Sequence, residues 1–256
     1  MRFRAKNALG SALNDRLKTY FEEFLLFGGY PAVVLTRQKE EKEKILEGIL
    51  GNYLLREIRS LLQLATEDEL LRLAKFLAAQ VGGLINYQEL SATSGLSYRE
   101  VRKHLEILQK TYLIDLLRPY FTNKRTELTK NPKVYFLDPG FRNFLVSDFR
   151  KIDQRGDAGM LVENHALAHL QRQASGFQSF YFWRTKSGAE MDFVLKEEGE
   201  LLPFEVKYAK SGALGKSFYS FIAKFSPKRA FVLTKEEIDE RKIKGTRVLF
   251  MPIMYL

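Results

Sequence analysis

The sequence contains no cysteine, which excludes disulfide bonds and cysteine-ligated zinc. No apolar run approaches the roughly 20 residues that a membrane-spanning helix needs. The first residues include Arg2, Arg4 and Lys6, and no apolar stretch of the kind found in a secretory signal follows them. Together these absences predict a cytoplasmic protein.

Basic charge, by contrast, is present in excess. The 256 residues include 41 lysines and arginines against 31 aspartates and glutamates, which gives a net charge of +10. A polyanion such as DNA is therefore the first partner to consider. Charge alone decides little, because the excess is spread over both halves of the chain. The location of the basic residues has to decide.

A helix-turn-helix with a basic second helix is predicted between residues 67 and 110. Helices at 67–80 and 87–93 precede the turn Ser94-Gly95-Leu96, and a longer helix follows it. Ser97 opens this helix with Glu100 three residues later, which is the pattern of a capping box. Its inward face would carry Val101, Leu105 and Leu108, and its outward face Tyr98, Arg99, Arg102, Lys103, Glu106 and Lys110.

Two strands and a polar loop after this helix would complete a winged helix. The strands are expected at 112–117 and 134–137, and the loop at 121–130. We expect phosphate contacts from Arg99, Arg102, Lys103, Lys124, Arg125 and Lys130, which would hold the protein on DNA without reading its sequence. The alternative is a winged helix that only packs domains together.

An α/β domain is predicted after a charged linker at 150–159. The pattern indicates a helix at 160–173, strands at 180–184, 190–195 and 201–208, a helix at 214–225, and strands at 229–233 and 248–253. Such an αβββαβ order is typical of helices layered on a mixed sheet. We therefore expect a mixed α+β fold with a helical segment at 1–65, a winged-helix domain at 66–149 and the α/β domain at 150–256.

Acidic residues and a lysine are expected to converge on two of these strands. Glu190 and Asp192 share one face of their strand, and Glu205 and Lys207 share one face of the next. A tight turn at 197–200 would bring the two faces together. Carboxylate oxygens of this kind suit a hard cation such as Mg²⁺ or Mn²⁺, and a nearby lysine can hold an attacking water or a phosphate oxygen.

Glu163, on the preceding helix, is expected to point toward the sheet and to need a partner there. Arg184, Lys207 or a metal could serve. The alternative is a buried Glu163–Arg184 ion pair with Asp192 and Glu205 exposed. Asp followed by Glu-x-Lys is the signature of the PD-(D/E)XK nuclease fold, and this segment resembles it.

Motifs along nearly the whole chain, in order, resemble one family. They are Gly28-Gly29-Tyr30-Pro31, Tyr135-Phe136-Leu137-Asp138-Pro139-Gly140, Gly159-x-x-x-Glu163-Asn164, Tyr181-x-Trp183-Arg184, Gly188-x-Glu190-x-Asp192-Phe193 and Glu205-Val206-Lys207. This arrangement is similar to the C-terminal half of the prokaryotic AAA+-type ATPases, whose tail is a PD-(D/E)XK nuclease-like domain of unknown function.

The resemblance implies a nuclease-type set made of Glu163, Asp192, Glu205 and Lys207, with Arg184 and Glu190 as neighbours. It implies a metal held by Asp192, Glu205 and Glu163, and an ATPase module as a partner in cis or in trans. The N-terminal nucleotide-binding module of that family is not in this sequence, so we expect either a C-terminal portion or a stand-alone relative.

Two other patterns are interpreted as structural. Gly212-Ala213-Leu214-Gly215-Lys216-Ser217 ends like a P-loop, but Lys210 stands where the first glycine belongs. His165 and His169 lie four apart on one helix, but no glutamate stands between them in an HExxH pattern and no third zinc ligand is evident. We expect packing or surface histidines.

Three functions remain open from the sequence. The first is a DNA-binding protein with a Mg²⁺-dependent nuclease-type domain. The second is a nuclease-like module without catalysis that regulates or docks on an ATPase. The third is a winged-helix transcription regulator with an α/β effector domain.

Overall fold

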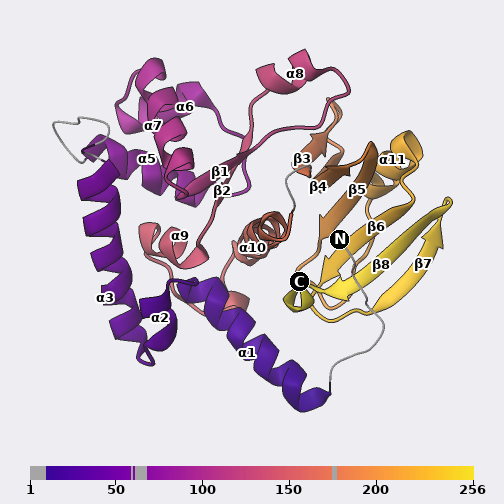
Figure 1. Cartoon of the computed structure of the whole chain (residues 1–256), viewed down its shortest axis with the longest axis horizontal. Coiled ribbons are helices and arrows are strands. Elements are labelled where there is room, and N and C mark those ends of the chain that lie inside the picture. The colour runs from indigo at the N-terminus through magenta and orange to yellow at the C-terminus, as the bar shows by residue number, and fades with distance from the viewer. Residues whose placement is uncertain (1–9, 59, 61–67, 175–177) are drawn as a thin grey trace. The chain divides into compact units, whose positions relative to one another are not determined.

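The structure is a computed structural model that describes residues 10–58, 60, 68–174 and 178–256. It has a mixed α+β fold, which confirms the expected fold class (Figure 1). The chain forms two compact units. The helical unit comprises Tyr20–Leu116 and Asn131–Gly156, and the sheet unit comprises Met1–Thr19, Leu117–Lys130 and Asp157–Leu256.

The helical unit is built from short helices and one small sheet. Its elements, with the first helix shared with the sheet unit, are α1 (Ser11–Phe27), α2 (Pro31–Leu35), α3 (Lys39–Ile49), the π-helix η1 (Leu50–Ile58), α5 (Asp68–Ala79), α6 (Tyr87–Ser94), α7 (Tyr98–Lys110), β1 (Ile114–Leu117), β2 (Lys133–Phe136), α9 (Pro139–Leu145) and the 3-10 helix η2 (Ile152–Gln154). Strands β1 and β2 pair with each other. Residues 1–9, 59 and 61–65 of the predicted helical segment, and the first residue of the predicted helix at 67–80, lie outside the described residues.

The helix-turn-helix forms as the sequence predicts. Ser97 accepts a hydrogen bond from the backbone N–H of Glu100, and the Glu100 carboxylate accepts one from the backbone N–H of Ser97, so the capping box is complete. Val101, Leu105 and Leu108 are buried in a cluster with α5 and α6. Because this apolar stripe faces the core, the basic side of α7 is left exposed.

Two motifs from the family resemblance, the segments 28–31 and 135–140, contact each other inside the helical unit. Gly28 ends α1 with a φ of 76°, and the carboxylate of Asp138 accepts hydrogen bonds from the backbone N–H groups of Gly29 and Phe141. A Cβ at Gly28 would lie 2.0 Å from Asp138 Oδ1, and one at Gly140 would lie 2.0 Å from the carbonyl oxygen of Phe27. The glycines are there because the two segments of backbone touch.

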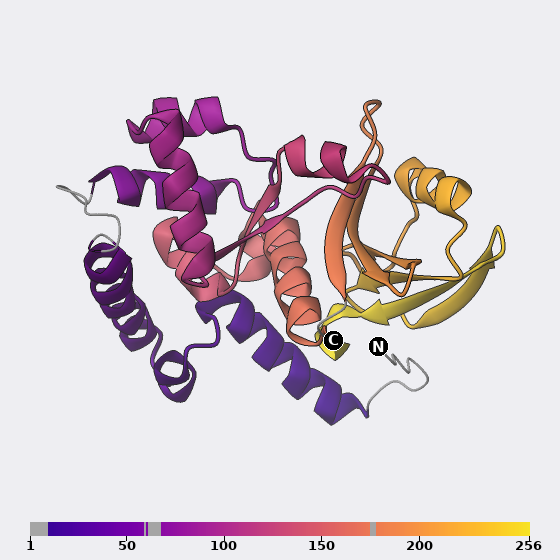
Figure 2. The ribbon, with the colours of Figure 1, turned by 45° about the horizontal axis from the view of Figure 1, so that its top comes forward.

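The sheet unit is a six-stranded mixed sheet covered by helices. The strands are β3 (Ser179–Arg184), β4 (Glu190–Glu197), β5 (Glu200–Val206), β6 (Arg229–Thr234), β7 (Asp239–Ile243) and β8 (Thr246–Pro252), in the order β3-β4-β5-β6-β8-β7. Helices α10 (Ala158–Arg172) and α11 (Lys216–Phe225) lie on opposite sides of this sheet (Figure 2). The chain closes with a 3-10 helix, η3 (Ile253–Tyr255). Strands β5, β6 and β8 are parallel, and the other pairs are antiparallel.

The hairpin between β4 and β5 is the tight turn that the sequence predicts. Glu197 pairs with Glu200, and the two residues between them, Glu198 and Gly199, have φ angles of 47° and 85°. Positive φ at both central positions matches the twist of the flanking strands. The turn therefore fixes the register of the two strands that carry the predicted acidic residues.

The predicted polar loop at 121–130 is wrong, because its second half is helix α8 (Lys124–Thr129). The side chain of Asn123 accepts hydrogen bonds from the backbone N–H groups of Arg125 and Thr126. Glu127 is 5% exposed and pairs with Lys124 at 2.9 Å. The sequence does not reveal this helix, because Glu127 is its buried residue and a carboxylate gives no apolar pattern.

Strand β7 was not predicted from the sequence either. It reads Asp-Glu-Arg-Lys-Ile, so it shows no apolar alternation. It forms because it pairs antiparallel with the buried strand β8 at the edge of the sheet, where charged side chains stay in solvent. Within the described residues, no helix is both long enough and apolar enough to cross a membrane.

Candidate functional site

Strands β4 and β5 separate at the predicted acidic residues. Their pairing runs from Glu197 and Glu200 to Phe193 and Phe204. Beyond this point β4 continues to pair with β3 as far as Glu190, and β5 continues to pair with β6 as far as Val206. We call this opening, with Glu190, Asp192, Glu205 and Lys207, the strand fork. The opening exists because β4 stays hydrogen-bonded to β3 and β5 stays hydrogen-bonded to β6 after β4 and β5 have separated.

The side chain of Asp192 connects the two strands at the strand fork. Its Oδ2 accepts a hydrogen bond of 2.7 Å from the backbone N–H of Val206, on the strand that has separated from its own. A backbone donor at a fork has lost its ladder partner, and a carboxylate satisfies it strongly. This contact was not foreseen from the sequence, where Asp192 was expected to hold a metal ion.

Glu205 and Lys207 form an ion pair on β5 and just after it. Lys207 Nζ lies 2.6 Å from Glu205 Oε1, and the Lys207 side chain is 38% exposed. The prediction that the two share one face of the strand is confirmed by this contact. Glu205 itself is 5% exposed, so the alternative in which this carboxylate lies on the surface is wrong.

The second oxygen of Glu205 is buried without a hydrogen-bond partner. Burial raises the pKa of Glu205, the hydrogen bond from Lys207 opposes that rise, and the nearby carboxylates of Glu163 and Glu190 add to it. Burial also acts to lower the pKa of Lys207, but its hydrogen bond to Glu205 and the charge of Asp192 raise that pKa overall. The lysine is therefore a charged donor at neutral pH.

The remaining predicted residues border the same place. Helix α10 packs on β5 and brings Glu163 within electrostatic reach of both Glu205 and Lys207. Arg184 Nη1 lies 3.5 Å from Glu190 Oε2, directly across the β3–β4 pairing. The structure thus brings Glu163, Glu190, Asp192, Glu205 and Lys207 together, and Arg184 joins them through Glu190.

No three His, Cys, Asp or Glu side chains among the described residues stand together as a ready-made metal site. The donor set at the strand fork is nevertheless of the right kind, because the unpartnered Oε2 of Glu205 is a carboxylate oxygen beside other carboxylates. A hard cation at Asp192, Glu205 and Glu163 stays a prediction.

The six basic residues expected to contact phosphates fall in two units. Arg99, Arg102 and Lys103 are exposed on α7 of the helical unit. Lys124, Arg125 and Lys130 belong to the sheet unit. There Lys124 Nζ lies 3.3 Å from the hydroxyl of Tyr181 and 5.3 Å from its ring centre. Three of the six residues therefore belong to each unit, and their contact with DNA stays a prediction.

The histidine pair proves to be part of the packing of α10. His165 is buried, and its ring centre lies 5.8 Å from that of His169. Burial lowers the pKa of His165 to about 3, and His169 and Arg172 add to the effect. The P-loop-like segment is also tied to the fold, because Gly212 donates its backbone N–H to Glu237 and a Cβ there would meet Val232 at 2.7 Å.

The chain belongs to a family described as a domain of unknown function, DUF8612, which matches residues 18–155. Residues 158–256 match a second domain of unknown function, DUF4143. The two matches meet between residues 155 and 158, next to the point where the helical unit ends and the main part of the sheet unit begins.

Relatives occur in distant microbes. An uncharacterized protein of Mycobacterium tuberculosis is 25% identical over 83% of this chain and 47% of its own length. An uncharacterized protein of Haemophilus influenzae is 25% identical over 77% of this chain and 48% of its own length. One of Methanocaldococcus jannaschii is 24% identical over 78% and 44%. The chain spans about half the length of the curated relatives it matches.

Proposed function

We propose that this chain binds DNA and that its sheet unit is a PD-(D/E)XK nuclease-like domain that hydrolyses phosphodiester bonds with Mg²⁺ or Mn²⁺. The single observation that carries the proposal is the buried, half-partnered carboxylate of Glu205 at the strand fork, beside the charged Lys207. Such an arrangement costs stability, and residues that a fold keeps at a cost are expected at functional sites.

Each residue of the strand fork has a role in this proposal. Asp192, Glu205 and Glu163 would hold the cation, which supplies a water of lowered pKa and offsets charge on the phosphate. Lys207 is charged, so it donates to the attacking water or to the developing negative oxygen and does not take up a proton. Arg184, paired with Glu190, would position the phosphate.

DNA contact is proposed for the exposed basic side of α7 in the helix-turn-helix of the helical unit. Arg99, Arg102 and Lys103 lie side by side on one exposed helix face, whose opposite stripe is buried. A helix presented in this way suits the phosphates that border a DNA groove. The proposal adds Lys124, Arg125 and Lys130 as a second set of contacts.

Work with an ATPase is also part of the proposal. DUF4143 is a domain often found with AAA ATPases, which supports such a module as a partner in cis or in trans. A second candidate function follows from the same residues. The absence of a ready-made group of three metal ligands in the described residues favours a nuclease-like module that docks on or regulates an ATPase without catalysis.

Cleavage of DNA decides between the two. Linear, flapped and branched DNA should be incubated with wild type and with Asp192→Asn in the presence of Mg²⁺ or Mn²⁺. We expect metal-dependent cleavage by wild type and at least a hundredfold loss in the variant, because the amide keeps the size of the side chain and removes its charge. Equal rates in both proteins would mean a contaminating nuclease. Cleavage by neither protein would favour the docking module.

Metal binding is measured separately from cleavage. Mg²⁺ or Mn²⁺ should raise the melting temperature of wild type, because a ligand that binds only the folded state stabilises it. Glu205→Gln should abolish this rise, whereas the exposed Glu198→Gln should keep it. A rise of equal size in Glu205→Gln would place the cation elsewhere.

A further inference from the structure

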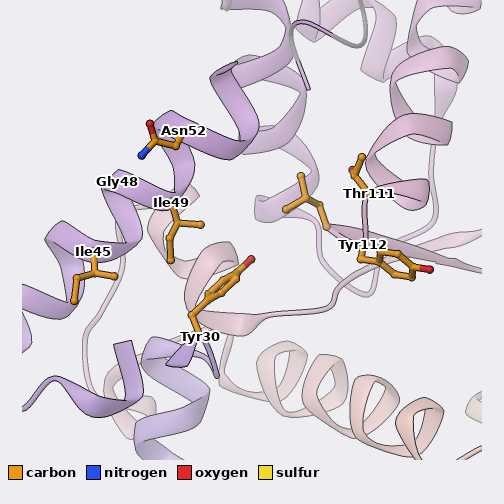
Figure 3. Close-up of a pocket in the computed structure, with 8 residues that line it drawn as sticks. Tyr30, Ile45, Gly48, Ile49, Asn52, Thr111 and Tyr112 are labelled. Atoms are coloured by element: carbon orange, nitrogen blue, oxygen red, sulfur yellow. The ribbon is translucent and has the colours of Figure 1, made fainter. Parts of the chain in front are cut away.

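The helical unit contains a pocket of about 620 Å³ that the proposed nuclease and DNA contacts do not use. One wall comes from α3 and η1, the other from the turn after α7, and Tyr30 lies between them (Figure 3). The lining residues are Ile45, Gly48, Ile49, Asn52, Tyr30 and the turn Thr111–Leu113. All of them belong to the same compact unit.

The lining of this pocket is apolar with a few neutral polar groups. The lining residues that the structure describes include no carboxylate, ammonium or guanidinium group. The Thr111 hydroxyl already donates to the carbonyl oxygen of Ile107 at 2.8 Å, so it is engaged within its own helix end and turn. A charged ligand would lie here without an opposite charge, which is costly in apolar surroundings.

Gly48 borders the pocket at a position where glycine weakens the helix. It lies in the last turns of α3, where alanine or a longer side chain would hold the helix better. A Cβ at this position would meet nothing within 4 Å, so close packing does not require the glycine. The glycine leaves this part of the pocket lining without a side chain.

Two further departures from regular backbone border the same pocket. Tyr112 has a φ of 59°, a left-handed conformation that is strained for a bulky residue. The α-helical pattern of α3 changes to the π-helix η1 at Leu50, between the lining residues Ile49 and Asn52. Three local costs at one pocket indicate that its shape serves a purpose.

We propose that this pocket binds a neutral, mainly apolar small molecule that lies against the ring of Tyr30, between Ile49 and the turn Thr111–Leu113. Its volume falls in the range of roughly 300–1,000 Å³ that small-molecule sites show. A nucleotide or a phosphate does not fit this chemistry, so the ligand is distinct from the DNA substrate of the proposed nuclease.

A pair of fluorescent probes tests the charge and the place of the site. N-phenyl-1-naphthylamine is neutral, and 8-anilinonaphthalene-1-sulfonate has the same ring system with one negative charge. Titrated into the whole chain, the neutral probe should bind saturably to one site, and the sulfonate should bind that site at least tenfold more weakly. No saturable binding of the neutral probe, or tighter binding of the sulfonate to that site, would overturn the proposal.

Matched glycine variants locate the binding. Gly48→Leu places a side chain in the pocket and should weaken binding of the neutral probe at least tenfold without lowering the melting temperature. Gly51 also has nothing within 4 Å of a built Cβ but does not line the pocket, so Gly51→Leu should stay within twofold of wild type. Ile45→Trp narrows the same wall and should repeat the loss. Equal affinity in Gly48→Leu and wild type, or equal loss in Gly51→Leu, would overturn the proposal.

Discussion

The pKa of Glu205 is the result of opposing influences from its surroundings. Its burial and the carboxylates of Glu163 and Glu190 favour the protonated form, while Lys207 favours the charged form. Its pKa is raised on balance, so the folded state loses stability as the pH rises through that pKa. This loss of stability is expected if the carboxylate has a functional role at the strand fork.

His165 predicts how the fold responds to acid. Its folded pKa of about 3 lies below the ordinary 6.5, so its contribution to stability is full above pH 6.5 and is lost as the pH falls. Wild type should lose about 2 kcal/mol of unfolding free energy from this residue between pH 7 and pH 5. His165→Leu should remove that part of the loss in urea unfolding at the two pH values. An equal loss in both proteins would mean that other groups dominate.

Gly140 predicts the strength of the contact between the two glycine motifs of the helical unit. A Cβ there would overlap the backbone of Phe27 and Gly28, which cannot move aside as a flexible side chain can. Gly140→Ala should therefore lower the free energy of unfolding by about 3 kcal/mol. Gly156→Ala is the matched control, because a Cβ at Gly156 meets nothing within 4 Å and its effect should stay below about 0.5 kcal/mol. Losses of the same size would remove the steric explanation.

At the scale of elements, what the sequence predicted follows from strong local signals. Helix α7 was predicted because its capping box and apolar stripe agree, and β4 and β5 were predicted because Glu198-Gly199 fixes their turn. Helix α8 and strand β7 were missed because their stability comes from Lys124–Glu127 and from pairing with β8, neither of which leaves an apolar period.

The candidate site was predicted only in part, for a related physical reason. Alternation along the strands gives the faces of Glu205 and Lys207, and the ion pair follows from it. The separation of β4 from β5 depends on pairing with β3 and β6, which are distant in the sequence. The hydrogen bond from Val206 to Asp192 was therefore beyond the reach of sequence patterns.

The capping box of α7 yields a prediction about this element. Ser97→Ala removes the acceptor for the backbone N–H of Glu100, which should lower the free energy of unfolding by about 1 kcal/mol. Urea unfolding measures it. The control is Ser220→Ala on the exposed side of α11, where alanine should be neutral or slightly stabilising. A neutral Ser97→Ala would mean that packing of the apolar stripe alone sets where α7 begins.

At the scale of the whole molecule, the net charge of +10 has to be connected to particular residues. The proposed DNA contacts are divided between the two units, with Arg99, Arg102 and Lys103 on one and Lys124, Arg125 and Lys130 on the other. Each phosphate that is neutralised releases condensed counterions, so the salt dependence of binding counts the contacts. The count can be taken separately for each unit.

The salt dependence of DNA affinity should distinguish specific contacts from general charge. Changing Arg99, Arg102 and Lys103 together to alanine should flatten the slope of log affinity against log salt by up to about 2.7, which is about 0.9 for each lost contact. The triple change at Lys124, Arg125 and Lys130 should have a smaller effect, because Lys124 is already paired with Glu127. A control triple at the exposed Lys18, Lys242 and Lys244 removes the same net charge and should leave the slope within about 0.5. If all three proteins lose the same amount, the binding is a diffuse effect of net charge and the helix-turn-helix has a packing role instead.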